Sequence, residues 1–110
     1  MEMSERNVGD VKVVAIKGDL DTTTAPDAEA YLKDAVEHGA RKLVLNLQKL
    51  DYTSSAGLRV FLATAKQVQA AGGTMRVCCL NETVDEIFDS SGFSSILDVS
   101  KTEEEARAAF

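Results

Sequence analysis

Histidine and cysteine, which often act in catalysis or bind metals, are scarce in this sequence. It has a single histidine, His38, and only two cysteines, Cys78 and Cys79, which are adjacent. Neighbouring cysteines rarely meet the geometry of a disulfide, and no cluster of cysteine and histidine has the spacing of a metal site. We therefore expect two small reduced thiols, buried on an apolar strand over residues 75–80, and neither a metal nor another cofactor.

A basic excess and a long apolar run are also absent. The 12 lysines and arginines are outnumbered by 18 aspartates and glutamates, which gives a net charge of −6. Such a chain is a poor ligand for the phosphates of nucleic acid or of an anionic membrane. No apolar stretch approaches the roughly 18 residues of a membrane span, and Met1–Glu5 lacks the basic and then apolar character of a leader. The sequence therefore indicates a cytoplasmic protein.

The residues that are present are sufficient for one folded domain. The chain has 110 residues, of which 45% are hydrophobic, and this content supports a core without help from disulfides. Because the sequence contains no linker, repeat or low-complexity tract, we expect a single domain over residues 1–110.

The chain is organised around one strand, turn and helix within Lys42–Ala71. Leu43–Leu47 is a nearly continuous apolar run, which is typical of a strand buried on both faces. After Gly57 the apolar spacing becomes helical, with a stripe formed by Leu58, Phe61, Leu62, Ala65 and Val68. Ser54 or Ser55 is a preferred N-cap for this helix, and two consecutive glycines end it.

Capping signals and periodicity predict the other elements. Before the central segment we expect a hairpin over residues 2–17 with its turn at 7–10, a polar loop at 18–23, and a helix capped by Thr24 and ended by Gly39. After it we expect the strand at 75–80, a helix capped by Asn81 or Thr83 and ended by Gly92, a short strand within 94–99, and a terminal helix. A capping box at 100–103 opens that last helix, whose expected core contacts are Ala106, Ala109 and Phe110.

This order of elements predicts an α/β fold and one edge for a site. Because a helix connects the strands at 11–16 and 43–47, these strands should be parallel and end at the same edge of the sheet. We expect a mixed sheet with parallel core strands and about four helices. The loop at 18–24 should then lie beside the loop at 48–55, at the carboxyl edge that ligands and partners favour. Asp21, Thr22 and Thr23 are therefore candidate contacts as well as loop residues.

Catalysis by Ser54 or Ser55 is disfavoured. A nucleophilic serine needs a base, and His38 is expected at the opposite edge of the sheet, roughly 20 Å away along a strand. A base must lie within about 2.6–3.2 Å, and the Gly-x-Ser-x-Gly elbow is also missing. We therefore expect no enzymatic activity.

Two phosphate-related alternatives are also weak. The loop before the central helix has one glycine and no lysine, unlike a P-loop, and Asp19 and Asp21 would repel the phosphates of a nucleotide. A receiver-like role with Asp51 as the phosphate acceptor lacks the acidic pair that holds magnesium after the first strand.

The central segment resembles a known signature. Asp51-Tyr52-Thr53-Ser54-Ser55-Ala56-Gly57-Leu58, followed by Arg59-Val60-Phe61-Leu62, is similar to the signature of the STAS domain of bacterial anti-sigma factor antagonists. The resemblance extends over essentially all 110 residues. In that family the phosphorylated serine lies two residues before the glycine at the helix start, which implies Ser55 here. Many members have an aspartate directly before this serine, whereas this chain has Ser54, the second candidate acceptor.

The resemblance implies a partner switch. The unphosphorylated protein would bind an anti-sigma factor that has a Bergerat-type ATPase fold and serine kinase activity, and a sigma factor would be released. Phosphorylation of Ser55 would end this binding, and a PP2C-type phosphatase would restore it. The alternative is a STAS interaction module of another signalling or scaffold system that does not act on a sigma factor. The resemblance also leaves nucleotide binding open.

The expected partner surface combines the two loops and the helix start. Its candidate residues are Asp21, Thr22, Thr23, Ser54, Ser55, Ala56, Gly57 and Arg59. A phosphate adds about −1.5 to −2 charges, and a like-charge contact at an interface costs several kcal/mol. We expect a side chain at Gly57 to project toward the partner, so that Gly57→Val impairs binding more than folding. We also expect a monomer.

Overall fold

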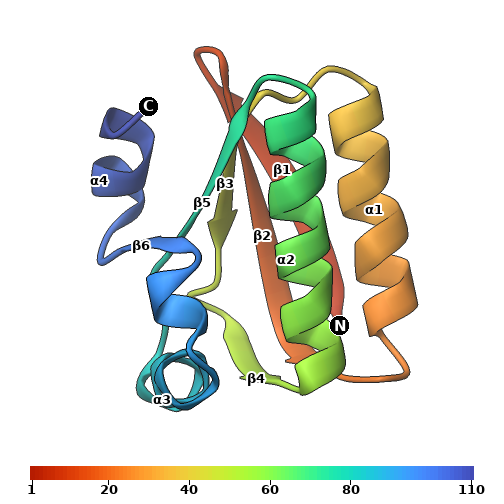
Figure 1. The fold of residues 1–110 in the computed structure, drawn as a ribbon, viewed down its shortest axis with the longest axis vertical. Coiled ribbons are helices and arrows are strands. Elements are labelled where there is room, and N and C mark those ends of the chain that lie inside the picture. The colour runs from red at the N-terminus through yellow and green to blue at the C-terminus, as the bar shows by residue number, and fades with distance from the viewer.

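The computed structural model describes all 110 residues (Figure 1). Its strands are β1 (Glu2–Val8), β2 (Val11–Leu20), β3 (Lys42–Asn46), β4 (Leu50–Thr53), β5 (Thr74–Cys78) and β6 (Asp98–Ser100). Its helices are α1 (Ala25–Glu37), α2 (Ser55–Ala70), α3 (Glu82–Ser91) and α4 (Glu103–Ala108), with a 3₁₀ turn, η1, at Phe93–Ser95. The predicted helices and the strands around them are confirmed as elements of one α/β domain.

The six strands form one mixed sheet. Its order is β1-β2-β3-β5-β6, and β4 pairs separately with β2. β1 is antiparallel to β2, whereas the pairs β2–β3, β3–β5 and β5–β6 are parallel. The predicted crossover through α1 is confirmed, since Val13 of β2 is in register with Val44 of β3. The ends of β2 and β3 therefore lie at the same edge of the sheet.

The two predicted loops at this edge contain strand residues, which corrects the sequence interpretation. β4 turns away from β3 after a backbone bond from Leu50 N to Leu47 O of 3.1 Å, and it pairs with the last residues of β2. The register shifts between Gly18 and Asp19, so β2 continues to Leu20 through an irregularity at Gly18. The glycine and aspartate that looked like a loop instead mark this irregularity.

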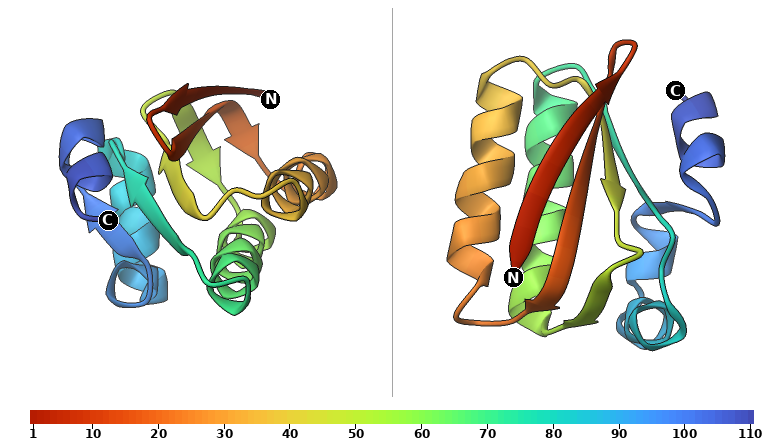
Figure 2. Two further views of the ribbon diagram at one scale, coloured as in Figure 1. Left: turned by 90° about the horizontal axis from the view of Figure 1, so that it is seen from above. Right: turned by 180° about the vertical axis from the view of Figure 1, so that it is seen from behind.

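Helices α1 and α2 lie side by side on one face of the sheet, and α4 lies on the other (Figures 1 and 2). The main core lies under α1 and α2 as a cluster of 21 buried residues. Phe61 of α2 is fully buried there, with its ring centroid 6.2 Å from that of Phe88 of α3. α3 contacts β4 and so closes the core at the carboxyl edge.

The C-terminal part departs from the prediction in three details. The N-cap of α4 is Thr102, whose hydroxyl accepts from Glu105 N at 3.2 Å, so the box predicted at 100–103 is displaced by two residues. Ala106 is buried as expected, but Ala109 and Phe110 are exposed because the helix ends at Ala108. Cys78 is buried on β5, whereas Cys79 lies beyond the strand, half-buried with φ +64°.

No helix of the structure combines the length and the apolar character that a membrane span requires.

Candidate functional site

The two adjacent serines have different roles at the start of α2. Ser54 is the N-cap, in an extended conformation, and its Oγ accepts from Gly57 N at 3.4 Å. Its backbone N–H also donates to Leu20 O at 2.8 Å, which ties the start of α2 to the end of β2. Ser55 is the first residue of the helix, is exposed, and makes no side-chain hydrogen bond. The free hydroxyl of the pair is therefore that of Ser55.

Gly57 is required by internal packing rather than by space for a partner. The glycine is buried, and a Cβ built on it would lie 2.2 Å from Thr53 Oγ1 and 2.8 Å from Leu20 Cγ. Real Cβ atoms do not approach so closely, so the prediction that a side chain here would project toward a partner is wrong. Gly57 lets α2 pack closely on the ends of β2 and β4.

The loop after β2 is built around Asp21. Its Oδ1 accepts from Thr23 N at 2.9 Å and from Thr24 N at 3.0 Å. These bonds from the backbone N–H groups of Thr24 and Thr23 hold the pKa of Asp21 below its usual value. Thr24 occupies the N-cap position of α1, as predicted, but its side chain makes no capping hydrogen bond, which corrects the prediction that it caps the helix. Its hydroxyl instead donates to Asp19 O at 3.0 Å and accepts from Asp21 N at 2.9 Å.

A shallow hollow of about 360 Å³ lies between α1 and α2, toward the N-termini of both helices. Its lining residues are Thr22, Ala25, Pro26, Glu29, Ala56, Arg59, Val60 and Ala63. The hollow thus brings together three of the predicted contact residues, Thr22, Ala56 and Arg59. Thr23 is exposed nearby in the loop, whereas Asp21 is half-buried and is occupied by its backbone bonds.

Sequence reasoning missed Tyr52. This tyrosine lies on β4, directly before the buried Thr53, and 46% of its surface is exposed. Large aromatic side chains exposed beside a binding surface are frequent anchors at interfaces. The signal that could have found it was an aromatic residue within the segment 48–55, which was predicted to lie at the binding edge.

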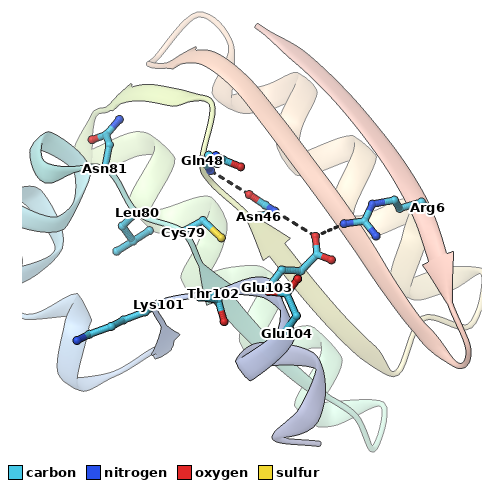
Figure 3. A pocket seen from close by; sticks show the side chains of 10 residues that line it. All are labelled: Arg6, Asn46, Gln48, Cys79, Leu80, Asn81, Lys101, Thr102, Glu103 and Glu104. Carbon is cyan, nitrogen blue, oxygen red and sulfur yellow. Dashed lines mark hydrogen bonds and ion pairs between the residues drawn. The ribbon is translucent and has the colours of Figure 1, made fainter.

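A second hollow, of about 610 Å³, lies on the α4 side of the sheet (Figure 3). Glu103 at the start of α4 accepts hydrogen bonds there from Arg6 of β1 and, at 3.1 Å, from Asn46 of β3. Burial by itself would raise the pKa of Glu103, but the bonds from Arg6 and Asn46 outweigh it and hold that pKa below its usual value. This network connects α4, near the C-terminus, to strands β1 and β3 of the sheet.

The only histidine is remote from the serines, as predicted. His38 is the C-cap of α1 and lines a hollow together with Asp10 and Lys42, at the edge where β3 begins. Ser55 follows β4 at the opposite edge, where β2 ends. No group of three or more histidine, cysteine, aspartate and glutamate residues is arranged to hold a metal ion. Ser55 thus presents an exposed hydroxyl at a helix start, far from His38.

Comparison with known protein families matches residues 3–106 to the STAS domain. The chain belongs to the STAS domain family. The relatives of this STAS protein include BtrV of Bordetella bronchiseptica, assigned as an anti-sigma factor antagonist, which is 39% identical over the whole chain and 95% of BtrV. The anti-sigma-B factor antagonist of Bacillus subtilis is 34% identical over 91% of the chain and 90% of that protein.

The fold of this STAS protein is also found among solved structures. The phosphorylated form of SpoIIAA, a cell fate determinant of Bacillus, superposes with a TM-score of 0.71 and 23% sequence identity. The match covers 96% of each chain. The similarity confirms the fold predicted from the sequence.

Proposed function

We propose that the protein is an anti-sigma factor antagonist that works as a partner switch. Its unphosphorylated form binds an anti-sigma factor that is also a serine kinase with a Bergerat-type ATPase fold, and a sigma factor is released. The kinase transfers the γ-phosphoryl group of ATP to Ser55 Oγ, with ADP leaving and the hydroxyl proton lost. A PP2C-type phosphatase hydrolyses the ester. This function is supported by the relatives named as anti-sigma factor antagonists, which the chain matches over 90% or more of their length.

The observation that carries the proposal is the division of roles between the two serines. Ser54 Oγ faces the helix as its cap, whereas Ser55 is exposed and its hydroxyl has no partner in the protein. A kinase can reach Ser55 without breaking a cap. Near the N-terminus of α2, a dianionic group is tolerated by the helix dipole, with a favourable effect of about 0.3–1 kcal/mol. Phosphorylation thus changes the surface and leaves the fold intact.

The proposed partner surface consists of Asp21, Thr22, Thr23, Ser54, Ser55, Ala56, Gly57 and Arg59, to which we add Tyr52. Within this surface Gly57 acts through the backbone shape of α2, and Asp21 acts by holding the loop that presents Thr22 and Thr23. Phosphate at its centre places about −1.5 to −2 charges against the partner. Uncompensated charge at an interface costs several kcal/mol, which is about a hundredfold or more in affinity.

We further propose that residues 1–110 act as one STAS module, as a monomer in the cytoplasm, without catalytic activity of their own. The exposed hydroxyl at Ser55 has no histidine beside it to act as a base, because His38 lies at the opposite edge. Purified protein that showed esterase, phosphatase or ATPase turnover, lost in Ser55→Ala, would contradict this part of the proposal.

The test of the function is reconstitution with the partner taken from the same cells. The purified chain is used as bait, and the captured protein is then expressed alone. We expect a small ATPase-fold protein that binds a sigma factor, releases it on addition of the unphosphorylated chain, and phosphorylates the chain when ATP is supplied. A partner that neither binds a sigma factor nor transfers phosphate would favour a module of another signalling system.

A further inference from the structure

Ser55 and Arg59 lie one turn apart on the exposed side of α2. They are residues i and i+4 of a 16-residue helix, and both are exposed. Side chains at this spacing are neighbours, with about 5–6 Å between their Cβ atoms. In addition, helical side chains lean toward the N-terminus, so a long side chain at Arg59 extends back over the turn that carries Ser55.

Arg59 has no ionic partner within the protein. Each of the six ion pairs of the structure uses other residues, and no side-chain hydrogen bond is made by the Arg59 guanidinium. Arg59 is also the only cation among the residues that line the hollow between α1 and α2, where the one anion is Glu29. The guanidinium is therefore available to a new anion placed at Ser55.

The backbone at the start of α2 offers only neutral donors, and two of its N–H groups are occupied. Gly57 N donates to Ser54 Oγ at 3.4 Å, and Leu58 N donates to Ser54 O at 3.1 Å. Ser55 N and Ala56 N make no hydrogen bond within the protein, but they are uncharged. The only charged donor on the first two turns of α2 is Arg59, and a guanidinium matches phosphate oxygens with two parallel N–H groups.

We propose that a phosphate on Ser55 binds the guanidinium of Arg59, and that phosphorylation thereby removes Arg59 from the contact with the partner. The inference rests on the proposed function, in which Arg59 contacts the partner through its exposed side chain. It gives the switch two simultaneous effects. The phosphate brings negative charge to the surface, and the cation that served the unphosphorylated complex becomes engaged within the same helix.

The ion pair itself is tested without any partner. Phosphoserine is incorporated at position 55 during synthesis of the protein, and the phosphate is titrated by ³¹P NMR in the wild-type and Arg59→Gln chains. The pair predicts that Arg59→Gln raises the second pKa of the phosphate by about 0.3 unit or more. The nearby anions Asp21, Glu29 and Asp51 are identical in both chains, so the difference isolates Arg59. Equal titration curves would overturn the proposal.

The removal of Arg59 from the interface is tested by a four-way binding comparison with the reconstituted partner. We expect Arg59→Gln to weaken the unphosphorylated complex about fivefold. Phosphorylation should then weaken the wild-type complex by about five times more than it weakens the variant complex, because the variant has no cation left to lose. If the two ratios are equal, Arg59 remains in contact with the partner after phosphorylation, and the proposal is wrong.

Lys66→Gln is the matched control. Lys66 is exposed on the same helix, makes no ion pair, and lies about three turns from Ser55. Lys66→Gln changes the net charge by the same amount as Arg59→Gln. We nevertheless expect the Lys66→Gln chain to keep the phosphate pKa of wild type, and phosphorylation to weaken its complex by the same factor as in wild type. A Lys66→Gln chain that behaves like Arg59→Gln would reduce the effect to overall charge and overturn the pair. If phosphorylation fails to weaken the wild-type complex, the proposed function and the withdrawal of Arg59 both fail, while the NMR titration still decides the pair.

Discussion

The two faces of the sheet are covered very differently. Under α1 and α2 lies the apolar cluster of 21 buried residues, whereas under α4 the buried cluster has five members, Val11, Val13, Val44, Cys78 and Ala106. Beside those five residues the α4 face carries Arg6, Asn46 and Glu103 in a polar network (Figure 3). A sheet of parallel strands normally has helices on both faces, and here the second cover is one short helix.

The difference shows which part of the molecule holds most of the core and carries the proposed switch. Ser55 begins the helix that rests on the large cluster, and the backbone of that helix start is fixed by Gly57 against Leu20 and Thr53. The site is therefore presented by the part of the molecule with the most burial. In the proposed function, a surface charge at Ser55 changes what the protein binds without disturbing the core.

The largest effect is expected from truncation under α1 and α2. Phe61→Ala removes a fully buried ring that packs on Phe88, and it should cost about 3–5 kcal/mol of unfolding free energy. Phe110→Ala is the matched control on the α4 side, where the ring is 36% exposed with the Arg76 guanidinium 5.6 Å from its centroid. It should cost about 1 kcal/mol or less. The free energies of unfolding are measured in urea. If Phe61→Ala and Phe110→Ala lowered them equally, the two faces would not differ in their contribution to stability.

Gly57→Val tests the close packing beneath the site. The added side chain collides with Thr53 Oγ1 and Leu20, so we expect a loss of about 1–3 kcal/mol or more. Ala56→Val is the control, because Ala56 is half-buried on the same turn and a β-branched residue costs a helix less than about 0.7 kcal/mol. Thermal melts of both variants decide the matter. A Gly57→Val protein that melts like wild type but fails to bind the partner would restore the earlier expectation.

Glu103→Gln tests the polar network of the α4 face. The substitution removes the negative charge that accepts hydrogen bonds from Arg6 and Asn46. The free energy of unfolding should fall by only about 1 kcal/mol at neutral pH, because the Arg6 side chain is 57% exposed and water screens the pair. The effect is thus smaller than either core substitution.

The same variant has a defined pH dependence. The folded-state pKa of Glu103 lies below its ordinary value of 4.5, so its contribution is complete above that pH and is lost as the pH falls through the folded value. Unfolding free energies of wild type and Glu103→Gln should therefore converge as the solution is acidified. A difference that stayed constant from pH 7 down to acid would show that the charge of Glu103 does not stabilise the fold.

The smallest effect on stability is expected at Ser55. Ser55→Asp should change the unfolding free energy by less than about 0.5 kcal/mol, because the residue is exposed and an acid in the first turn suits the helix dipole. It should nevertheless weaken the complex with the kinase partner, although one carboxylate carries less charge than a phosphate. Ser54→Ala gives the converse control, since loss of the cap costs about 1 kcal/mol. A Ser55→Asp chain that bound as tightly as wild type would contradict the charge mechanism.

The elements that the sequence predicted well are those whose pattern is local. The apolar run of β3 and the helical stripe of α2 each predict their element without information from the rest of the chain. The predicted cap at Asn81 is confirmed, since its side chain accepts a hydrogen bond from Val84 N at 2.8 Å. The parallel pairing of β2 with β3 followed from the helix between them. The strand, stripe and cap depend on spacing within a few residues, which a sequence displays directly, and the pairing follows from the order of these elements along the chain.

The features that were missed depend on contacts between distant segments. β4 has only four residues, and its burial does not alternate, so nothing local distinguishes it from a loop until it pairs with the end of β2. The burial of Gly57 likewise comes from Leu20, which is 37 positions earlier in the chain. The choice of Ser54 as the cap was open because both serines can cap, and only the path of the backbone from β4 into α2 decides between them.

The site of phosphorylation is the most direct test of the whole account. The wild-type, Ser54→Ala and Ser55→Ala chains are incubated with the reconstituted kinase and ATP, and the modified residue is mapped by mass spectrometry. The account predicts one phosphate on Ser55 in the wild-type and Ser54→Ala chains, none in Ser55→Ala, and a Ser55→Ala chain that still binds the partner. Phosphate found chiefly on Ser54, or undiminished phosphorylation of Ser55→Ala, would contradict it.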